Sequence, residues 1–140
     1  MSLETWLANG WLVRHTASGQ ETSDLIDAAV RDLADARKDV SPSWRFAIAY
    51  NAALRLCTAV LQTAGYRASR DQKHYRTIAA LPLALGVEAQ EIARFLDSCR
   101  IKRHEVTYEA LSGVTEAEAA ELVEAVGELE TLVRDWLCSR

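Results

Sequence analysis

Residues 100–108 combine strong bases, a histidine and a phenol in the sequence RIKRHEVTY. If this stretch is helical, five of its polar side chains fall within an arc of roughly 140°, because successive residues of an α-helix are about 100° apart. These five are Arg100, Arg103, His104, Thr107 and Tyr108. Arginine holds phosphate through paired hydrogen bonds and stays charged, whereas histidine exchanges protons near neutrality. The stretch therefore has the residue types for binding, and for cleaving, a phosphodiester.

Cleavage of RNA without a metal would give these residues separate roles. The reaction needs a base for the 2′-hydroxyl proton, an acid for the leaving 5′-oxygen and a cation for the charge of the transition state. We interpret Arg103, His104 and Tyr108 as candidate catalytic residues, with Arg100 and Lys102 as phosphate ligands. Tyr108 is a weak base, because an unperturbed phenol has a pKa of about 10. The alternative is a solvated helix face whose long side chains only cover apolar surface.

A second basic segment, residues 67–76, contains three arginines and a lysine but only one aspartate. We expect it to be a polar loop beside residues 100–108, because an anionic ligand needs cations that converge. Its candidate ligand-binding residues are Arg67, Arg70 and His74. Asn51 is a further candidate, because an asparagine inside a helix is unfavourable unless it bonds a neighbour or faces a site.

Composition and charge limit the class of protein. The 140 residues are 49% apolar and 26% charged, as in an average soluble domain, and their number suits one domain spanning residues 1–140. The net charge of −4 excludes binding of nucleic acid over the whole surface but permits a local basic patch. We find no signal peptide and no stretch of about 18 uncharged apolar residues, so we expect a cytoplasmic protein without membrane contact.

Common cofactor and metal motifs are absent from the sequence. The cysteines Cys57, Cys99 and Cys138 are widely spaced, with no C-x-x-C pair, and we interpret the first two as core residues. Glycine-rich phosphate loops, the G-x-S-x-G elbow, H-E-x-x-H and zinc patterns do not occur. The sequence therefore predicts neither a metal nor a cofactor.

Apolar residues at spacings of three and four predict the first two main helices. One begins at Ser18 or Thr22 and extends to about residue 38. The next begins at Ser41 and Pro42, a cap followed by proline at the first helical position, and ends at Gly65.

Two further main helices complete the predicted fold. One spans about residues 88–111, after a shorter helix that Pro82 should kink or end, and the last begins at Thr115. No alternating pattern typical of strands appears. We therefore expect an all-α fold, an antiparallel bundle of four main helices with additional short helices, on which residues 1–18 dock as a short segment.

Four parts of the sequence carry a resemblance to a known family: Phe46 with Ala49-Tyr50-Asn51-Ala52-Ala53, Gly65-Tyr66-Arg67, His74, and Arg100-x-Lys102-Arg103-His104-x-x-x-Tyr108. Together they resemble the HEPN family of all-helical domains (higher eukaryotes and prokaryotes nucleotide-binding), from about residue 20 to the last helix. Ribonucleases of this family carry arginine, a polar residue, three to five further residues and then histidine, and they dimerise to form a composite site. Arg103 and His104 match the start of that motif, and Tyr108 stands in place of its histidine.

The resemblance implies an HEPN-like protein that binds nucleotide, RNA or a partner protein. Some members are encoded beside minimal nucleotidyltransferases as toxin–antitoxin pairs, and this chain would then be the HEPN half of such a pair. Two alternatives stay open: a metal-independent ribonuclease, and a helical interaction protein with no ligand. We also expect a homodimer, because the helix of residues 88–111 has apolar positions on two arcs, with Ile101 apart from Phe95 and Cys99.

Overall fold

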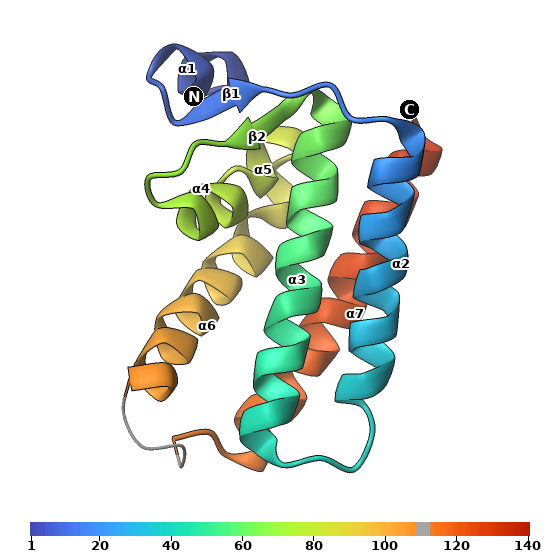
Figure 1. The fold of residues 1–140 in the computed structure, drawn as a ribbon, viewed down its shortest axis with the longest axis vertical. Helices are drawn as coiled ribbons and strands as arrows, with labels where there is room; N and C mark the ends of the chain where they lie inside the picture. Colours follow the sequence, from blue (N-terminus) through green and yellow to red (C-terminus); the bar gives the residue numbers. More distant parts are fainter. Residues whose placement is uncertain (109–112) are drawn as a thin grey trace.

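The computed structural model describes residues 1–108 and 113–140, and the side chains of residues 105–108 lie outside this described part. The chain is mostly helical, which confirms the all-α class. In the described residues the longest helices are α2 (Gly19–Ala36), α3 (Pro42–Ala64), α6 (Gln90–Tyr108) and α7 (Glu116–Cys138) (Figure 1). The shorter elements are α1 (Leu3–Ala8), β1 (Leu12–Arg14), β2 (Tyr66–Ala68), α4 (Lys73–Ala79), α5 (Leu81–Leu85) and the 3₁₀ turn η1 (Val87–Ala89).

Capping residues place the helix ends close to the predicted positions. Ser18 and Ser41 begin α2 and α3, because each side-chain oxygen accepts a hydrogen bond from the backbone N–H three residues later. α3 ends at Gly65, whose φ of 100° is a left-handed conformation that favours glycine. Thr115 and Glu118 form a reciprocal capping box at the start of α7. These predicted boundaries are confirmed.

α3 is the central helix of the bundle. It packs along α2 on one side and along α7 on another, and it also contacts α6. Its alanines at positions 49, 52, 53 and 59 are completely buried, so neighbouring helices can come close to its backbone. Larger buried side chains of α3, including Tyr50, Leu56 and Val60, fill the remaining space of the main core.

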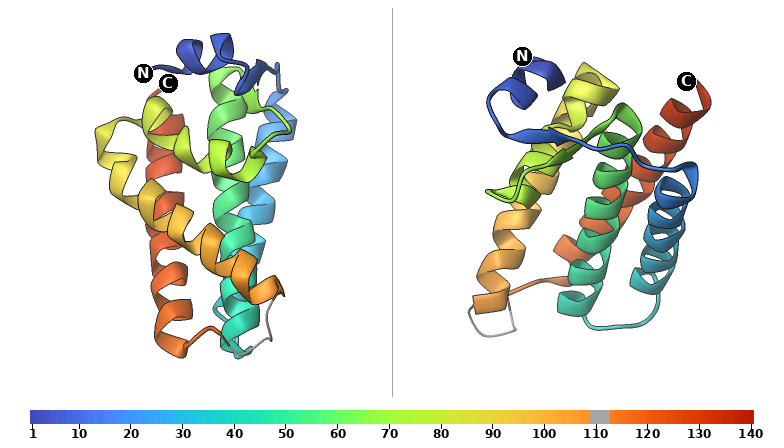
Figure 2. Two further views of the ribbon diagram at one scale, coloured as in Figure 1. Left: turned by 90° about the vertical axis from the view of Figure 1, so that its left-hand side faces the viewer. Right: turned by 45° about the horizontal axis from the view of Figure 1, so that its top comes forward.

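The long helices alternate in direction along the chain, but their packing neighbours differ from those of a regular antiparallel bundle. Figure 1 shows α2 and α6 descending and α3 and α7 ascending. α3 and α7 therefore run in the same direction, yet they are extensively packed against each other. Parallel helices usually lie on the diagonal of an up-and-down bundle. Here α7 flanks α3, and α6 is inclined to both (Figure 2).

A short two-stranded sheet contradicts the expectation that the chain has no strands. β1 and β2 pair antiparallel, with Leu12 opposite Ala68 and Arg14 opposite Tyr66. Strands of three residues are too short to show a period of two in the sequence. Leu12, Tyr66 and Ala68 pack with Trp6 of α1 in a second, smaller core, so residues 1–18 contact the rest of the chain through both α1 and β1.

The segment predicted as a loop over residues 67–76 instead contains β2 and the first residues of α4. The loop prediction is wrong. The sequence shows no usual start signal for α4, because Gln72, the residue before the helix, has a φ of 54° and makes no side-chain cap. Pro82 lies in the first turn of α5 and separates it from α4, as predicted. Gly86, with a φ of 109°, then leads the chain into η1 and α6.

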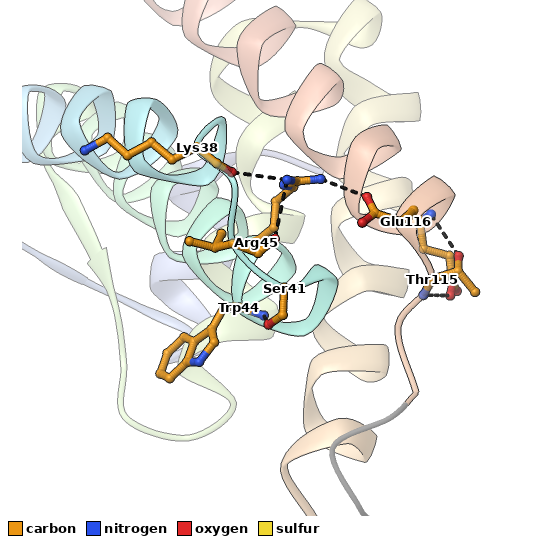
Figure 3. A network of polar contacts seen from close by, with 8 residues as sticks. Lys38, Ser41, Trp44, Arg45, Thr115 and Glu116 are labelled. Atoms are coloured by element: carbon orange, nitrogen blue, oxygen red, sulfur yellow. Dashed lines mark hydrogen bonds and ion pairs between the residues drawn. The ribbon is translucent and has the colours of Figure 1, made fainter.

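Arg45, near the start of α3, connects three parts of the fold (Figure 3). Its guanidinium donates hydrogen bonds to the backbone carbonyls of Lys38 at 3.1 Å and Val40 at 3.4 Å, which lie in the connection from α2 to α3. The same guanidinium pairs with the Glu116 carboxylate at 3.0 Å. The start of α7 is thereby fixed to the end of α2, while the neighbouring Trp44 side chain stays exposed.

Candidate functional site

An open hollow of about 470 Å³ lies where α4 meets α6. Its lining residues are Gln72, Lys73, His74, Tyr75 and Arg100, and we call it the basic hollow. The start of α4 and the residue before it supply four of these side chains, and α6 supplies Arg100. The fold thus brings His74 and Arg100, candidates from two distant segments of the sequence, to one place.

Arg100 is held in a defined position in the hollow. Its Nε donates a hydrogen bond to Asp97 Oδ1 at 2.8 Å, one helical turn earlier. Its guanidinium carbon also lies 5.4 Å from the centroid of the Tyr75 ring, within the range of a cation–π contact. In the described residues no hydrogen bond to its two terminal nitrogens is found. A bound phosphate could therefore accept hydrogen bonds from that end of the fork.

Arg103 is directed toward α3. Its guanidinium carbon lies 5.3 Å from the ring centroid of Tyr50, which is only 1% exposed. Burial raises the pKa of Tyr50 to about 12, against the opposing effect of Arg100 and Arg103. Among the described residues the Tyr50 hydroxyl has no hydrogen-bond partner. Arg103 thus combines a packing role on Tyr50 with a positive charge close to the hollow.

The environment of His74 favours its neutral form. The loss of water around the ring is the main cause that lowers its pKa, and the charges of Lys73, Arg103 and Arg100 lower it further. The side chain nevertheless stays accessible to solvent. A neutral imidazole can accept a proton or a hydrogen bond at pH 7, so His74 has the protonation state of a general base.

Arg76, the next basic residue of α4, lies among aromatic rings. Its guanidinium carbon is 4.0 Å from the ring centroid of Trp11, 5.5 Å from that of Trp6 and 5.4 Å from that of Tyr75. Because Tyr75 also contacts Arg100, a continuous series of arginine–aromatic contacts joins the N-terminal segment to the hollow. This series fixes Tyr75 in the wall of the hollow.

Lys102 belongs to a different surface of α6. Its ammonium lies 3.3 Å from a carboxylate oxygen of Glu118, on α7. The pairing is not visible in the sequence of α6 alone, because Glu118 belongs to another helix. The partner from α7 neutralises Lys102, which lines a separate crevice with Phe46 and Cys99.

The other described candidates do not line the hollow. Arg67 is exposed on β2 opposite Val13, and Arg70 is exposed in the turn before α4. Asn51 is exposed on α3, about 100° around the helix from Tyr50. His104 is exposed on α6. The side chain of Tyr108 lies outside the described residues, although its backbone belongs to α6.

Gln72, Lys73 and Tyr75 line the hollow but were not among the residues predicted for it. Lys73 and Tyr75 are the sequence neighbours of His74. If the sequence had shown that a helix begins at residue 73, all three residues would have been expected in one turn. That signal was hidden by the absence of a capping residue at Gln72. The sequence identified the segment but not its local structure.

The described residues contain no group of three or more histidine, cysteine or acidic side chains that could hold a metal ion. Burial raises the pKa of Cys57 and of Cys99 to about 12, which suits their predicted place in the core. Within residues 1–108 and 113–140 no helix has the length and apolar character needed to cross a membrane. Comparisons with protein-family models, curated proteins and solved structures give no match to this chain.

Proposed function

We propose that this chain is an HEPN-like domain that binds RNA or a nucleotide through phosphate contacts in the basic hollow, with its four long helices as the HEPN-like bundle. One observation carries the proposal. Lys73 and His74 at the start of α4 and Arg100 of α6 line the same open hollow, and Arg100 is positioned by Asp97 and Tyr75. Cations from separate elements that converge on one hollow suit a phosphate-bearing ligand.

The net charge of the chain makes such a site local and sensitive to salt. The protein carries a net charge of −4, so most of its surface repels a polyanion. Binding to single-stranded RNA should weaken with salt by a slope of about −0.7 for each phosphate contact. Two or three contacts in the basic hollow therefore predict weak binding with a shallow slope of about −1.4 to −2.

Fluorescence anisotropy with a labelled single-stranded RNA of about 12 nucleotides tests the proposal. Arg100→Ala should weaken binding about tenfold, because it removes the positioned guanidinium. Arg94→Ala is the matched control, since Arg94 is exposed on the same helix but does not line the hollow. Equal affinities of the two variants, or binding that does not change with salt, would count against a phosphate site in the hollow.

The partners implied by the HEPN resemblance are part of the same proposal. A second copy of the chain would complete a composite site, and Ile101, an apolar side chain of α6 that is 47% exposed, supports such an interface. Light scattering that gives the mass of a monomer at micromolar concentration would contradict the dimer. A nucleotidyltransferase is the protein partner proposed for a toxin–antitoxin pair, and co-purification of the two expressed together would test it.

The state of His74 favours slow, metal-independent ribonuclease activity as a second candidate. His74 is neutral at pH 7 beside Arg100, as a base for the 2′-hydroxyl must be. Cleavage in the presence of a chelator should then leave a 2′,3′-cyclic phosphate, and His74→Gln or His104→Ala should slow it. Tyr108→His should accelerate cleavage, because it restores the histidine of the family motif. Cleavage at equal rates in all of these variants would exclude the mechanism.

A further inference from the structure

A second open groove, of about 480 Å³, lies between the N-terminal part of α6 and α7. Partly exposed apolar side chains form its floor: Ile92, Phe95, Ala125 and Leu132. Glutamates surround them: Glu88, Glu91, Glu121, Glu124 and Glu128. We call this surface the acidic groove. Glu91 lies about half a turn around α6 from Arg100, so the groove and the basic hollow occupy different sides of the helix.

The glutamates of the acidic groove lack counter-charges. In the part of the chain that the structure describes, none of the five forms an ion pair, whereas Glu118 and Glu130 on the same helix α7 pair with Lys102 and Arg134. Glu124 lies three residues after Glu121 and four before Glu128, a spacing at which like charges on a helix repel. A partner that binds here would therefore gain affinity by supplying cations.

The spacing of the lining residues suits a helical partner. On α7 they lie at positions 121, 124, 125, 128 and 132, and on α6 at positions 91, 92 and 95, so one face of each helix borders the groove, and Glu88 of η1 completes the border. The α7 border extends over eleven residue steps, or about 16 Å, which is about three turns of a docked helix. Helices dock in such grooves through apolar residues at i, i+3, i+4 and i+7.

We propose that the acidic groove binds a basic amphipathic helix of a partner protein. Leucine-like side chains of that helix would cover Ile92, Phe95 and Leu132, and its lysines or arginines would pair with the surrounding glutamates. This chain offers no such helix itself in its described part. The apolar faces of α2, α3 and α7 are buried in the main core, and the bases of α6 at positions 100, 102 and 103 already contact Asp97, Glu118 and Tyr50. The occupant is therefore a segment of another protein.

A synthetic helical peptide of leucine and lysine provides the probe. About 18 residues long, it carries leucine at i, i+3, i+4 and i+7 and lysine elsewhere, and a second peptide of equal composition has its leucines dispersed around the helix. Binding to the full chain is measured by anisotropy, and the contact surface is mapped by NMR chemical-shift changes. The patterned peptide should bind more tightly than the dispersed one, with shifts confined to α6 and α7.

Charge reversal in the acidic groove should remove this binding. Glu124→Lys with Glu128→Lys should weaken the patterned peptide about tenfold or more, because two attractive contacts become repulsive. The control Asp27→Lys with Asp135→Lys changes the net charge by the same amount at exposed positions outside the groove and should change affinity less than about threefold. Circular dichroism confirms that each variant is folded.

Three outcomes would overturn the proposal. Equal weakening in the groove variant and in its control would show attraction to the overall negative charge. Equal binding of the patterned and dispersed peptides would show that the apolar floor plays no part. A change of oligomeric state caused only by the groove variant would identify a second copy of this chain as the occupant.

Discussion

The basic hollow and the acidic groove share one helix, α6, but they hold their charges in different ways. In the hollow, Asp97 and Tyr75 position Arg100, and no large apolar floor is present. In the groove, the lining glutamates form no ion pair within the described part of the chain and surround an apolar floor. The positioned guanidinium of the hollow suits a small group with a concentrated charge. The unpaired carboxylates around the apolar floor of the groove suit a macromolecular partner.

The order of the charges along α6 agrees with the helix dipole. Glu91 lies in the first turn, and Arg100, Lys102 and Arg103 lie in the second half. Acids near the N-terminus and bases toward the C-terminus are both favourable to a helix. One helix can therefore present surfaces of opposite sign, and the two should respond independently to substitution because their residues do not contact one another.

Exchange of charge in each surface separately should produce the largest effects. Arg100→Glu should abolish measurable RNA binding, a loss of about tenfold or more, because it places a carboxylate where phosphate is expected. Glu124→Lys with Glu128→Lys should leave RNA bound at least as tightly as in the unaltered protein. Anisotropy titrations of each variant with RNA and with the leucine–lysine peptide measure both affinities side by side.

If the groove variant lost RNA binding, or if Arg100→Glu lost peptide binding in a folded protein, the two surfaces would not be independent. A shared binding surface along α6 would then replace the two separate ones. Arg94→Glu is the control for charge reversal on the same helix.

Removal of the Tyr50 hydroxyl should have the next largest effect, and it should stabilise the protein. Tyr50 lies beneath Arg103, and its hydroxyl is buried with no hydrogen-bond partner among the described residues. Tyr50→Phe keeps the ring under the guanidinium but removes the cost of the unsatisfied hydroxyl, so the free energy of unfolding should increase by about 1 kcal/mol. Thermal unfolding should shift upward by about 3 °C.

Tyr50→Leu provides the comparison, because it removes the ring together with the hydroxyl. That variant should be less stable than the unaltered protein, since it loses both buried aromatic surface and the contact with Arg103. A destabilising effect of Tyr50→Phe would show that the hydroxyl helps to hold this side of α6 in place. A stabilising effect of Tyr50→Leu would show that the ring and its contact with Arg103 do not.

The sequence predicts the helices of this fold better than their arrangement. Ser41, Pro42, Gly65 and Thr115 are local signals, and each marks a helix end in the structure. The strands β1 and β2 have three residues each, and their pairing joins segments more than fifty residues apart, so no local pattern reveals them. The parallel packing of α3 and α7 likewise depends on which faces meet in three dimensions.

The same limit applies to the candidate site. Residue types along one helix indicated Arg100 and its basic neighbours, and composition indicated the segment that contains His74. Whether a charge is compensated depends on other helices, however, as the Lys102–Glu118 pair shows. The acidic groove was hidden for a similar reason, because the glutamates of α7 and the start of α6 become one surface only when the two helices pack together.

Relief of charge crowding in the acidic groove should give a smaller gain in stability. Glu124→Gln with Glu128→Gln removes like charges four residues apart on α7, a repulsion of about 0.2–0.5 kcal/mol for an exposed pair. Unfolding in denaturant should show an increase of this size at low salt that disappears at about 1 M salt, where the Debye length is about 3 Å. An increase that persists at high salt would have a cause other than repulsion between the glutamates.

The smallest expected effect concerns the pH dependence of stability at His74. Because packing and the nearby cations lower its pKa in the folded protein, the unfolded chain binds more protons between that lowered pKa and the ordinary value of histidine. Stability should therefore decline as the pH falls through this interval, and His74→Gln should remove that part of the decline. His15→Gln is the control, since His15 lies 3.0 Å from Glu21, away from the hollow.

Binding of a phosphate ligand should reverse the preference of His74 for its neutral form. An anion beside the ring stabilises the imidazolium, so the pKa of His74 measured by NMR titration should rise when RNA is added. By linkage, RNA should bind more tightly as the pH falls through the same interval, and His74→Gln should bind with less dependence on pH. A pKa of His74 that does not change on addition of RNA would place the phosphate outside the basic hollow. The contrast between the two surfaces of α6 would then rest on the acidic groove alone.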